Sequence, residues 1–557
     1  MDKKYYLVLF VIFIIGVFLR FFQIGNNPAS LYWDEVAIGL DAYAINATGR
    51  DMNNQHWLQP IYPSYGDYKA PVYILLTSLS TRILGLSPLS IRLPIAIFSV
   101  LAMLTYYLLI IEILSFENGK KTLTKTKIVT LVSFLLLAVS PWSVHFGRIG
   151  LESSLSVFWL LLGVYLFLRT INSNKAWLLI FSVISSAIGV YSYYSLRVIV
   201  PLLFFGLGLI FIKFLRKNWL YSIISIILFL ILNIPIYKSN HYERSQGYRL
   251  NNDNLITATK VITESSHFLE RYNSNQFSRL AYHRDWFWIG DFLENYLSHF
   301  KMDFLFISGD QNLRHHSGYG GQFFFILFPF YYIGLVNLIK NLKNKSNQII
   351  GIFVLVSPIP AAMVYETPHA SRSIYLLVPI IFIISSGVFK SMKYFYKNKS
   401  LFFLFAVFFA FNFSFYYLDY FIDYPRRSSK DWIYAYSQVS EYIRDNYQKY
   451  SEIDIDGKYW MPELYIYFRF PNLIIDGQKM KEAMINNPIN SFGLKNPLEK
   501  IIVTKYEKDE NGNERLKPKA MFMDPEAEIS NEYQLINTFY FLDEEPSINL
   551  FVSDMEK

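Results

Sequence analysis

The sequence contains no cysteine, which excludes disulfide bonds, zinc–thiolate sites and cysteine-ligated iron–sulfur clusters. Charge is also scarce, because only 17% of the 557 residues are Asp, Glu, Lys or Arg, against about a quarter in soluble proteins. The net charge of +8 is not accompanied by a basic helix or by a sheet motif of basic and aromatic residues, so we expect no nucleic-acid partner. Apolar residues, in contrast, make up 53% of the chain.

These apolar residues form repeated runs of about the 17 to 25 residues needed to cross a hydrocarbon core. The first run, residues 5–22, follows Lys3 and Lys4 and has no small-residue cleavage site after it, so we expect a retained span that enters from the cytoplasm. Ten further spans are expected in residues 91–114, 128–146, 155–168, 176–194, 198–214, 220–237, 323–339, 349–364, 374–388 and 401–417. The predicted fold class is an α-helical polytopic membrane protein with about 11 transmembrane helices.

Basic residues predict the orientation of these spans. They gather in the inferred inner segments, such as GKKTLTKTK at 119–127, as the positive-inside rule requires of cytoplasmic loops. Residues 71–84 are short and polar for a span, and counting them as one would place this lysine-rich loop outside. We therefore expect them along the outer interface, and we expect a cytoplasmic-membrane protein with residues 23–70, 238–322 and 425–557 on the extracytoplasmic side.

The composition changes after the last span. A helix-like stretch at 431–446 and strand-like runs at 472–475, 500–506 and 534–541 predict a small C-terminal extracytoplasmic α/β domain. The predicted domains are a transmembrane domain of residues 1–424 and this domain of residues 425–557. The first outer loop, 23–70, is the expected catalytic loop of the transmembrane domain.

Ionisable residues cluster at the predicted outer face, where they are costly and indicate function. They are Asp34, Glu35, Asp67, Lys69, Arg148, Glu152, Arg197, His369 and Arg372. A carboxylate can act as a general base toward a hydroxyl or an amine, and lysine and arginine can hold a phosphate. Cations would also stabilise the charge on a departing lipid phosphate. The pattern predicts group transfer from a phospholipid-like carrier.

Four motifs in the first part of the chain, WDE at 33–35, YKAPVY at 68–73, SIRLPIAIFSVL at 90–101 and SPWSVHFGRIGLE at 140–152, resemble a known family. They are similar to the GT-C membrane glycosyltransferases that use polyprenyl-phosphate sugars, and most similar to the protein O-mannosyltransferase and aminoarabinose transferase branch. The resemblance covers about the first 200 residues, is weaker at PHASRS (368–373) and does not extend to the C-terminal domain.

The resemblance implies roles for individual residues. Asp34 matches the first-loop acid, which serves as the base or as an acceptor-binding carboxylate, and Glu35 matches the second acid beside it. Lys69 stands where aminoarabinose transferases have a lysine that acts on the carrier phosphate. Two neighbours depart from that pattern, because Tyr68 replaces an acid and Ala70 replaces a proline. The missing acid puts a metal site at that point in doubt.

We therefore expect an inverting glycosyltransferase that moves a sugar from a polyprenyl-phosphate donor to an envelope protein, lipid or glycan. The expected catalytic residues are Asp34 and Glu35, and the expected substrate-binding residues are Lys69, Arg148, Glu152, Arg197, His369 and Arg372. No metal ligand is assigned, and a divalent metal cofactor is left open. The alternative is a transporter or flippase of a lipid-linked intermediate, but such folds show paired halves and helices broken in mid-membrane, which this sequence lacks.

Plainer explanations compete at most of these positions. Asp34 could cap a helix, Glu35 could be a solvated helix-face residue, and Lys69 could snorkel at the interface. For Arg148, Arg197 and Arg372 the competing role is anchoring to lipid headgroups, and for Asp67 it is a turn.

Histidines raise the question of a metal. His315 and His316 are adjacent and show no spaced partner, so a flexible polar loop is expected there. His369 and Arg372 would share a helix face if the next span begins early.

Overall fold

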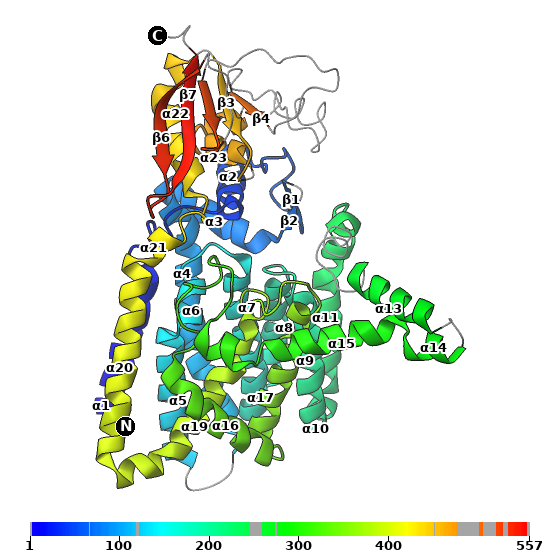
Figure 1. The fold of residues 1–557 in the computed structure, drawn as a ribbon. Coiled ribbons are helices and arrows are strands. Elements are labelled where there is room, and N and C mark those ends of the chain that lie inside the picture. The colour runs from blue at the N-terminus through cyan, green and yellow to red at the C-terminus, as the bar shows by residue number, and fades with distance from the viewer. Residues whose placement is uncertain are drawn as a thin grey trace. The chain divides into compact units, whose positions relative to one another are not determined.

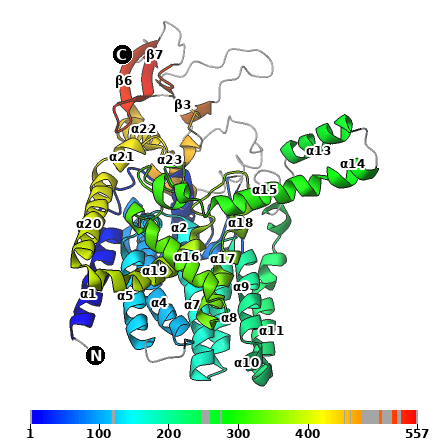
Figure 2. The same ribbon diagram turned by 60° about the horizontal axis from the view of Figure 1, so that its bottom comes forward.

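The computed structural model describes residues 3–65, 67–117, 122–245, 259–272, 276–450, 452–459, 461–475, 501–504, 520–526 and 533–553. The chain forms two compact units, each built from two separate stretches of sequence. Unit 1 comprises Met1–Phe22 and Ile95–Tyr417, and unit 2 comprises Gln23–Pro94 and Leu418–Lys557. Figures 1 and 2 show the elements of each unit from two directions.

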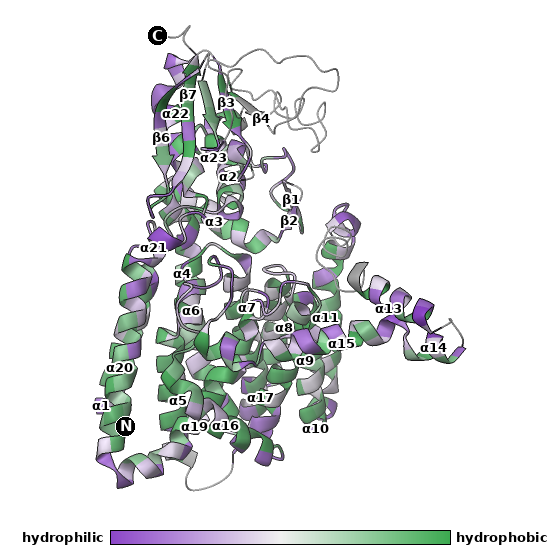
Figure 3. Ribbon diagram, in the orientation of Figure 1, coloured by the Kyte–Doolittle hydropathy of each residue, from purple (hydrophilic) through white to green (hydrophobic). Residues whose placement is uncertain are grey.

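Unit 1 is a bundle of helices that are mostly apolar along their length (Figure 3). In chain order it contains α1 (Lys3–Phe21), most of α4 (Pro88–Leu114), α5 (Thr122–Val139), α6 (Pro141–Phe146), α7 (Glu152–Ser173), α8 (Leu178–Val190), α9 (Leu196–Ile210), α10 (Ile212–Lys217) and α11 (Trp219–Tyr237). It continues with α13 (Thr259–Arg271), α14 (Gln276–Ala281), α15 (Arg284–Ser298), the π-helix η2 (Asp303–Ile307), the 3₁₀ turn η3 (Phe325–Leu327), α16 (Phe328–Lys340), α17 (Lys345–Val356), α18 (Ile359–Ala362), the 3₁₀ turn η4 (Ile374–Leu376), α19 (Leu377–Lys397) and most of α20 (Lys399–Ile422).

Within the described ranges, six helices are long and apolar enough to cross a membrane, and they include α1, α4, α7, α11 and α20. The stretches Phe325–Lys340 and Lys345–Ala362 pass the same test only together, and they are bent by 115° at their junction. Three shorter apolar helices are α3 (Pro71–Leu84), α8 and α9. The protein is thus a multi-pass membrane protein, as predicted, and the number of eleven spans stays a prediction.

The expected span of residues 128–146 is broken. Residues 128–146 form two helices, α5 and α6, that meet at Ser140, whose backbone is extended. Pro141 at the start of α6 has no N–H to continue the helical hydrogen bonds, so it can begin a helix but cannot extend one. The break places the start of α6 next to the loops of the candidate site described below.

Helices α16 and α19 pack at backbone contact distance through two glycines. A Cβ added at Gly334 would lie 1.8 Å from the carbonyl oxygen of Ile383, and one at Gly387 would lie 1.8 Å from that of Phe330. Small residues allow membrane helices to approach this closely. The two glycines are therefore fixed by the close approach of the helices.

We expect Gly334→Ala to destabilise unit 1 by about 1–3 kcal/mol, because the new methyl group forces two backbones apart. Thermal unfolding of the detergent-solubilised protein measures this as a lower Tm. Gly351→Ala in α17 is the matched control, since its nearest neighbour would be a Leu342 methyl group at 3.8 Å. An equal Tm for the Gly334 variant and the control would contradict the proposed close packing.

Unit 2 combines residues 23–94 with the C-terminal residues. Its first stretch holds α2 (Trp33–Thr48), the hairpin strands β1 (Tyr62–Ser64) and β2 (Asp67–Lys69), α3 and the start of α4. Its second stretch holds α21 (Tyr424–Arg427), α22 (Tyr434–Asn446), the 3₁₀ turn η5 (Tyr447–Lys449), β3 (Ile453–Asp456), α23 (Pro462–Arg469), α24 (Asn472–Ile475), β4 (Ile501–Thr504), β5 (Ala520–Met523), β6 (Tyr533–Tyr540) and β7 (Pro546–Ser553).

The C-terminal residues contain a five-stranded mixed sheet in the order β4-β3-β5-β7-β6. Strand β3 pairs in parallel with β4 and β5, and β7 pairs antiparallel with β5 and β6. The predicted mixture of helix and strand in the C-terminal residues is confirmed, but residues 472–475 form the helix α24 where a strand was expected. A run of four residues carries no period that separates a strand from a helix. Strands β3, β5 and β7 were not predicted from the sequence.

Residues 23–70 and the C-terminal residues share one hydrophobic core. The domain boundary predicted at residue 425 would have placed them in different domains. Helix α2 packs against α23, and Val36 and Leu40 are buried in the same cluster as Tyr436 and Ile466. The hydroxyl of Tyr465 donates a hydrogen bond of 2.8 Å to the carbonyl of Leu31. The described C-terminal residues therefore support the start of the helix that carries Asp34.

Candidate functional site

Helix α2 presents two acids in its first turn. It begins at Trp33 after the extended N-cap residue Tyr32, so Asp34 lies inside the helix and does not occupy the cap position considered above. Negative charge in a first turn is stabilised by the helix dipole. The backbone N–H of Tyr32 donates to Oε2 of Glu35 at 3.1 Å, which fixes the helix start.

Asp34 forms an ion pair with Lys69. Lys69 ends strand β2 of the β1–β2 hairpin, and its Nζ also lies 3.6 Å from Oδ2 of Asp67 and 5.3 Å from the centre of the Trp33 ring. The Lys69 side chain is only 5% exposed, which does not fit an interfacial snorkelling lysine, while that of Asp34 is 22% exposed. The structure thus places a partly accessible carboxylate beside a buried cation.

Glu35 is held in a buried ion pair with Arg92. Nε of Arg92 donates to Oε1 at 2.8 Å and an Nη donates to Oε2 at 2.9 Å, with both side chains shielded from solvent. Arg92 also donates to the carbonyl oxygens of Pro28 at 3.0 Å and Ser30 at 2.6 Å. Glu35 is therefore not the solvated residue considered above, and its engaged carboxylate does not fit the expected role in proton transfer or acceptor positioning.

Arg92 is the important residue that the sequence analysis did not assign. Arg92 lies in the SIRLP motif, one of the motifs that resemble the GT-C family. That motif was the only feature of the sequence that could have indicated a role for Arg92. Its guanidinium also lies 5.5 Å from the centre of the Trp432 ring. Arg92 thereby connects the start of α2 with the C-terminal residues of unit 2.

Desolvation shifts the pKa of carboxyl groups elsewhere in unit 2. Desolvation raises the pKa of Asp41 well above its usual value, and the charge of Asp51 adds to the shift. Burial also raises the pKa of Glu463 on α23 to about 7. Nothing in the sequence pattern around these residues distinguishes them from solvated acids.

In unit 1 three loops meet at one end of the described helices. The indole N–H of Trp142 in α6 donates to the carbonyl of Ala370 at 3.2 Å, and the backbone N–H of Ala370 donates to Oδ2 of Asp310 at 2.7 Å. The hydroxyls of Ser153 at the start of α7 and Ser371 are 2.8 Å apart. Residues near 142–153, 310 and 369–373 are thus brought together.

The predicted cations of unit 1 differ in their surroundings. Arg148 is fully buried and donates to the carbonyl of Leu19 at 2.7 Å, which does not fit a lipid headgroup anchor. Arg197 lies in the first turn of α9, with its guanidinium carbon 4.0 Å from the centre of the Tyr194 ring. Arg372 lies in a turn before η4 and not on a helix, so it shares no helix face with His369. Its backbone N–H donates instead to Nδ1 of His369 at 3.3 Å.

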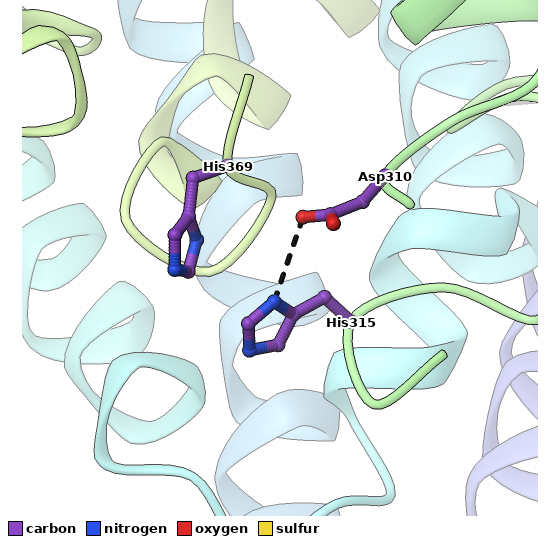
Figure 4. Close-up of side chains that lie close together, drawn as sticks. All are labelled: Asp310, His315 and His369. Atoms are coloured by element: carbon purple, nitrogen blue, oxygen red, sulfur yellow. Dashed lines mark ion pairs between the residues drawn. The ribbon is translucent and has the colours of Figure 1, made fainter. Parts of the chain in front are cut away.

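His315 has spaced partners that the sequence analysis missed. Asp310, His315 and His369 offer one ligand atom each, and these atoms lie within 4.8 Å of one another (Figure 4). Burial would raise the pKa of Asp310, but the hydrogen bond and charge of His315 outweigh it and lower that pKa. Burial lowers the pKa of His369. Asp310 lies 5 residues before His315 in the same loop, and His369 lies 54 residues after it in another loop, so no single stretch of sequence shows the three together.

Comparison with known proteins supports the resemblance found in the motifs. Residues 68–237 match the family described as dolichyl-phosphate-mannose-protein mannosyltransferase. No curated protein matches the sequence significantly.

Some solved structures resemble this chain at low sequence identity. The apo oligosaccharyltransferase of Archaeoglobus fulgidus is similar at 15% identity with a TM-score of 0.48, over 84% of this chain and 63% of that one. The same protein, named AglB, in complex with an inhibitory peptide and a dolichol-phosphate gives the same values. ArnT from Cupriavidus metallidurans bound to undecaprenyl phosphate is similar at 9% identity with a TM-score of 0.43, over 89% of this chain and 75% of that one.

This chain therefore spans a little under two thirds of the length of the archaeal enzyme. The predicted resemblance to GT-C membrane glycosyltransferases of the mannosyltransferase-like branch is confirmed by the family match over residues 68–237.

Proposed function

We propose that the protein is an integral membrane glycosyltransferase that transfers a sugar from a polyprenyl-phosphate donor to an envelope acceptor outside the cytoplasm. The observation that carries this proposal is the pairing of Asp34 in the first turn of α2 with Lys69 of YKAPVY. The matched family supports the donor class, because its description names a dolichyl-phosphate mannose. The acceptor is proposed only as an envelope protein, lipid or glycan.

In the proposed reaction the acceptor hydroxyl or amine attacks the anomeric carbon of the donor sugar. The bond from acceptor to carbon forms as the bond from carbon to phosphate oxygen breaks on the opposite face, so the configuration inverts. Asp34 takes the acceptor proton as general base. The electron pair of the broken bond leaves on the lipid phosphate, whose charge Lys69 stabilises.

The ion pair between Asp34 and Lys69 is compatible with the proposed reaction. Each partner balances the charge of the other while no substrate is bound. A donor phosphate that pairs with Lys69 would draw the ammonium away and leave the Asp34 carboxylate free to accept a proton. Trp33, whose ring lies near Nζ of Lys69, would give the sugar an apolar wall.

Glu35 has a different role in this proposal. Its ion pair with Arg92 positions the first turn of α2 and hence Asp34. Substrate binding by Arg148, Glu152, Arg197, His369 and Arg372 stays a prediction.

The proposal is tested with full-length protein in lipid nanodiscs, supplied with polyprenyl-phosphate donors that carry labelled mannose, glucose or aminoarabinose and with an extract of envelope components. We expect one donor to be consumed, with release of polyprenyl phosphate and appearance of label in the acceptor. Movement of the intact donor across a sealed vesicle without cleavage would favour the flippase alternative and overturn the enzyme proposal. Mass spectrometry of envelope lipids and glycoproteins from a deletion strain identifies the sugar and the acceptor.

A further inference from the structure

Two loops of unit 1 bring metal-ligating side chains together. Asp310 and His315 belong to the loop that follows η2, and His369 belongs to the loop that precedes η4. Figure 4 shows the three side chains turned toward a common space. Nδ1 of His315 lies 3.5 Å from Oδ2 of Asp310, and the two imidazole rings are 4.5 Å apart between centres.

The backbone holds these groups in place. Asp310 accepts hydrogen bonds from the N–H of Asn312 at 2.9 Å and from the N–H of Ala370 at 2.7 Å, so its carboxylate is fixed to both loops. Nδ1 of His369 accepts the N–H of Arg372 at 3.3 Å, which orients this imidazole ring. Asp310 and His369 are both less than a tenth exposed. A cluster fixed in this way loses little side-chain freedom when it binds an ion.

We propose that Asp310, His315 and His369 form a binding site for a divalent transition-metal ion. Two imidazoles and one carboxylate suit Zn²⁺ and its neighbours in the first transition row better than Mg²⁺ or Ca²⁺, which prefer all-oxygen sites. Ligand atoms around tetrahedral Zn²⁺ lie roughly 3.4 Å apart at bonds of about 2.1 Å. The ligand atoms of Asp310 and His315 already have nearly this spacing. The ligand atom of His369 needs to move inward by roughly 1 Å.

Three protein ligands leave the fourth position of the ion open to water or to an oxyanion. A second layer of contacts supports the site, because Nε2 of His299 accepts the backbone N–H of His369 at 3.2 Å and Nδ1 of His299 lies 2.8 Å from the carbonyl oxygen of Asn295. The ion would join the loop after η2 to the loop before η4. This site does not depend on the proposed glycosyltransferase activity.

The test is direct metal binding by the full-length protein, purified in detergent with an affinity tag that contains no histidine. After stripping with a chelator, the protein is titrated with Zn²⁺ and with Co²⁺, and bound metal is counted by elemental analysis and by the visible d–d absorption of Co²⁺. We expect close to one equivalent per chain and a Tm that rises with Zn²⁺. Asp310→Asn, His315→Gln and His369→Gln should each weaken binding about tenfold or more.

His283→Gln is the matched control, because His283 lies at the start of α15 with a half-exposed side chain and is not part of the cluster. It should bind metal as the wild-type protein does. Wild-type protein that binds far less than one equivalent overturns the proposal, whatever the variants do. Unchanged binding in folded Asp310→Asn protein, checked by gel filtration, overturns it as well.

Discussion

Asp34→Asn protein should transfer sugar about 10²- to 10⁴-fold more slowly than the wild-type protein. The amide keeps the size of the side chain and its place in the first turn of α2, but it cannot take the acceptor proton. Lys69 also loses one of its two carboxylate neighbours in the free protein, so donor binding should weaken little. The measurement is release of polyprenyl phosphate at saturating donor, which separates kcat from KM.

Asp67→Asn is the matched control for this prediction. Oδ2 of Asp67 lies 3.6 Å from the same lysine, so the substitution removes a similar charge from Lys69 without removing the proposed base. Its effect on kcat should be much smaller. Unimpaired transfer by the Asp34 variant, or an equal loss in both variants, would remove Asp34 from the mechanism.

Arg92→Met should destabilise unit 2 by about 3–5 kcal/mol, because it leaves the carboxylate of Glu35 buried without its cation. Glu35→Gln should cost a similar amount, since it leaves the guanidinium unpaired. The double variant Glu35→Met/Arg92→Met removes both charges and should regain part of the loss. The recovery should be partial because the carbonyls of Pro28 and Ser30 also lose their donor.

Chemical or thermal unfolding of the solubilised protein measures these differences. The control is Arg444→Met, whose partner Asp445 lies 2.8 Å away with both side chains well exposed, and an exposed pair contributes about 0–1 kcal/mol. A loss for Arg92→Met no larger than for this control would show that the buried pair does not fix the start of α2. Full recovery in the double variant would show that the carbonyl contacts contribute nothing.

Local pattern was sufficient to predict a multi-pass membrane protein and a helix start near Asp34, because both depend on neighbouring residues. Apolar length and lysine-rich loops identify a membrane protein without tertiary information. A break at Ser140–Pro141 could also have been predicted, since a proline inside a helical run ends or kinks it. The short run at 472–475 was misassigned because four residues carry no usable period.

What the sequence could not predict depends on contacts between distant residues. Glu35 was expected to be catalytic, with a solvated helix face as the plainer explanation, and neither expectation included an ion pair with Arg92, 57 positions later. His315 looked isolated until His369 was placed 4.5 Å away. Tyr465 and Leu31 are separated by 434 positions, and no periodicity or spacing in a single sequence reports such a pair.

Unit 2 is assembled from two stretches that are separated by residues 95–417, and this sets the order of events during synthesis. Residues 23–94 leave the ribosome first, but the apolar face of α2 has no completed core to pack on until the residues after Leu418 have been made. A chain that stopped before Leu418 would still carry Asp34 and Lys69. It would lack the surface that packs against α2, the helix that carries Asp34. An incomplete chain would therefore not form the finished site.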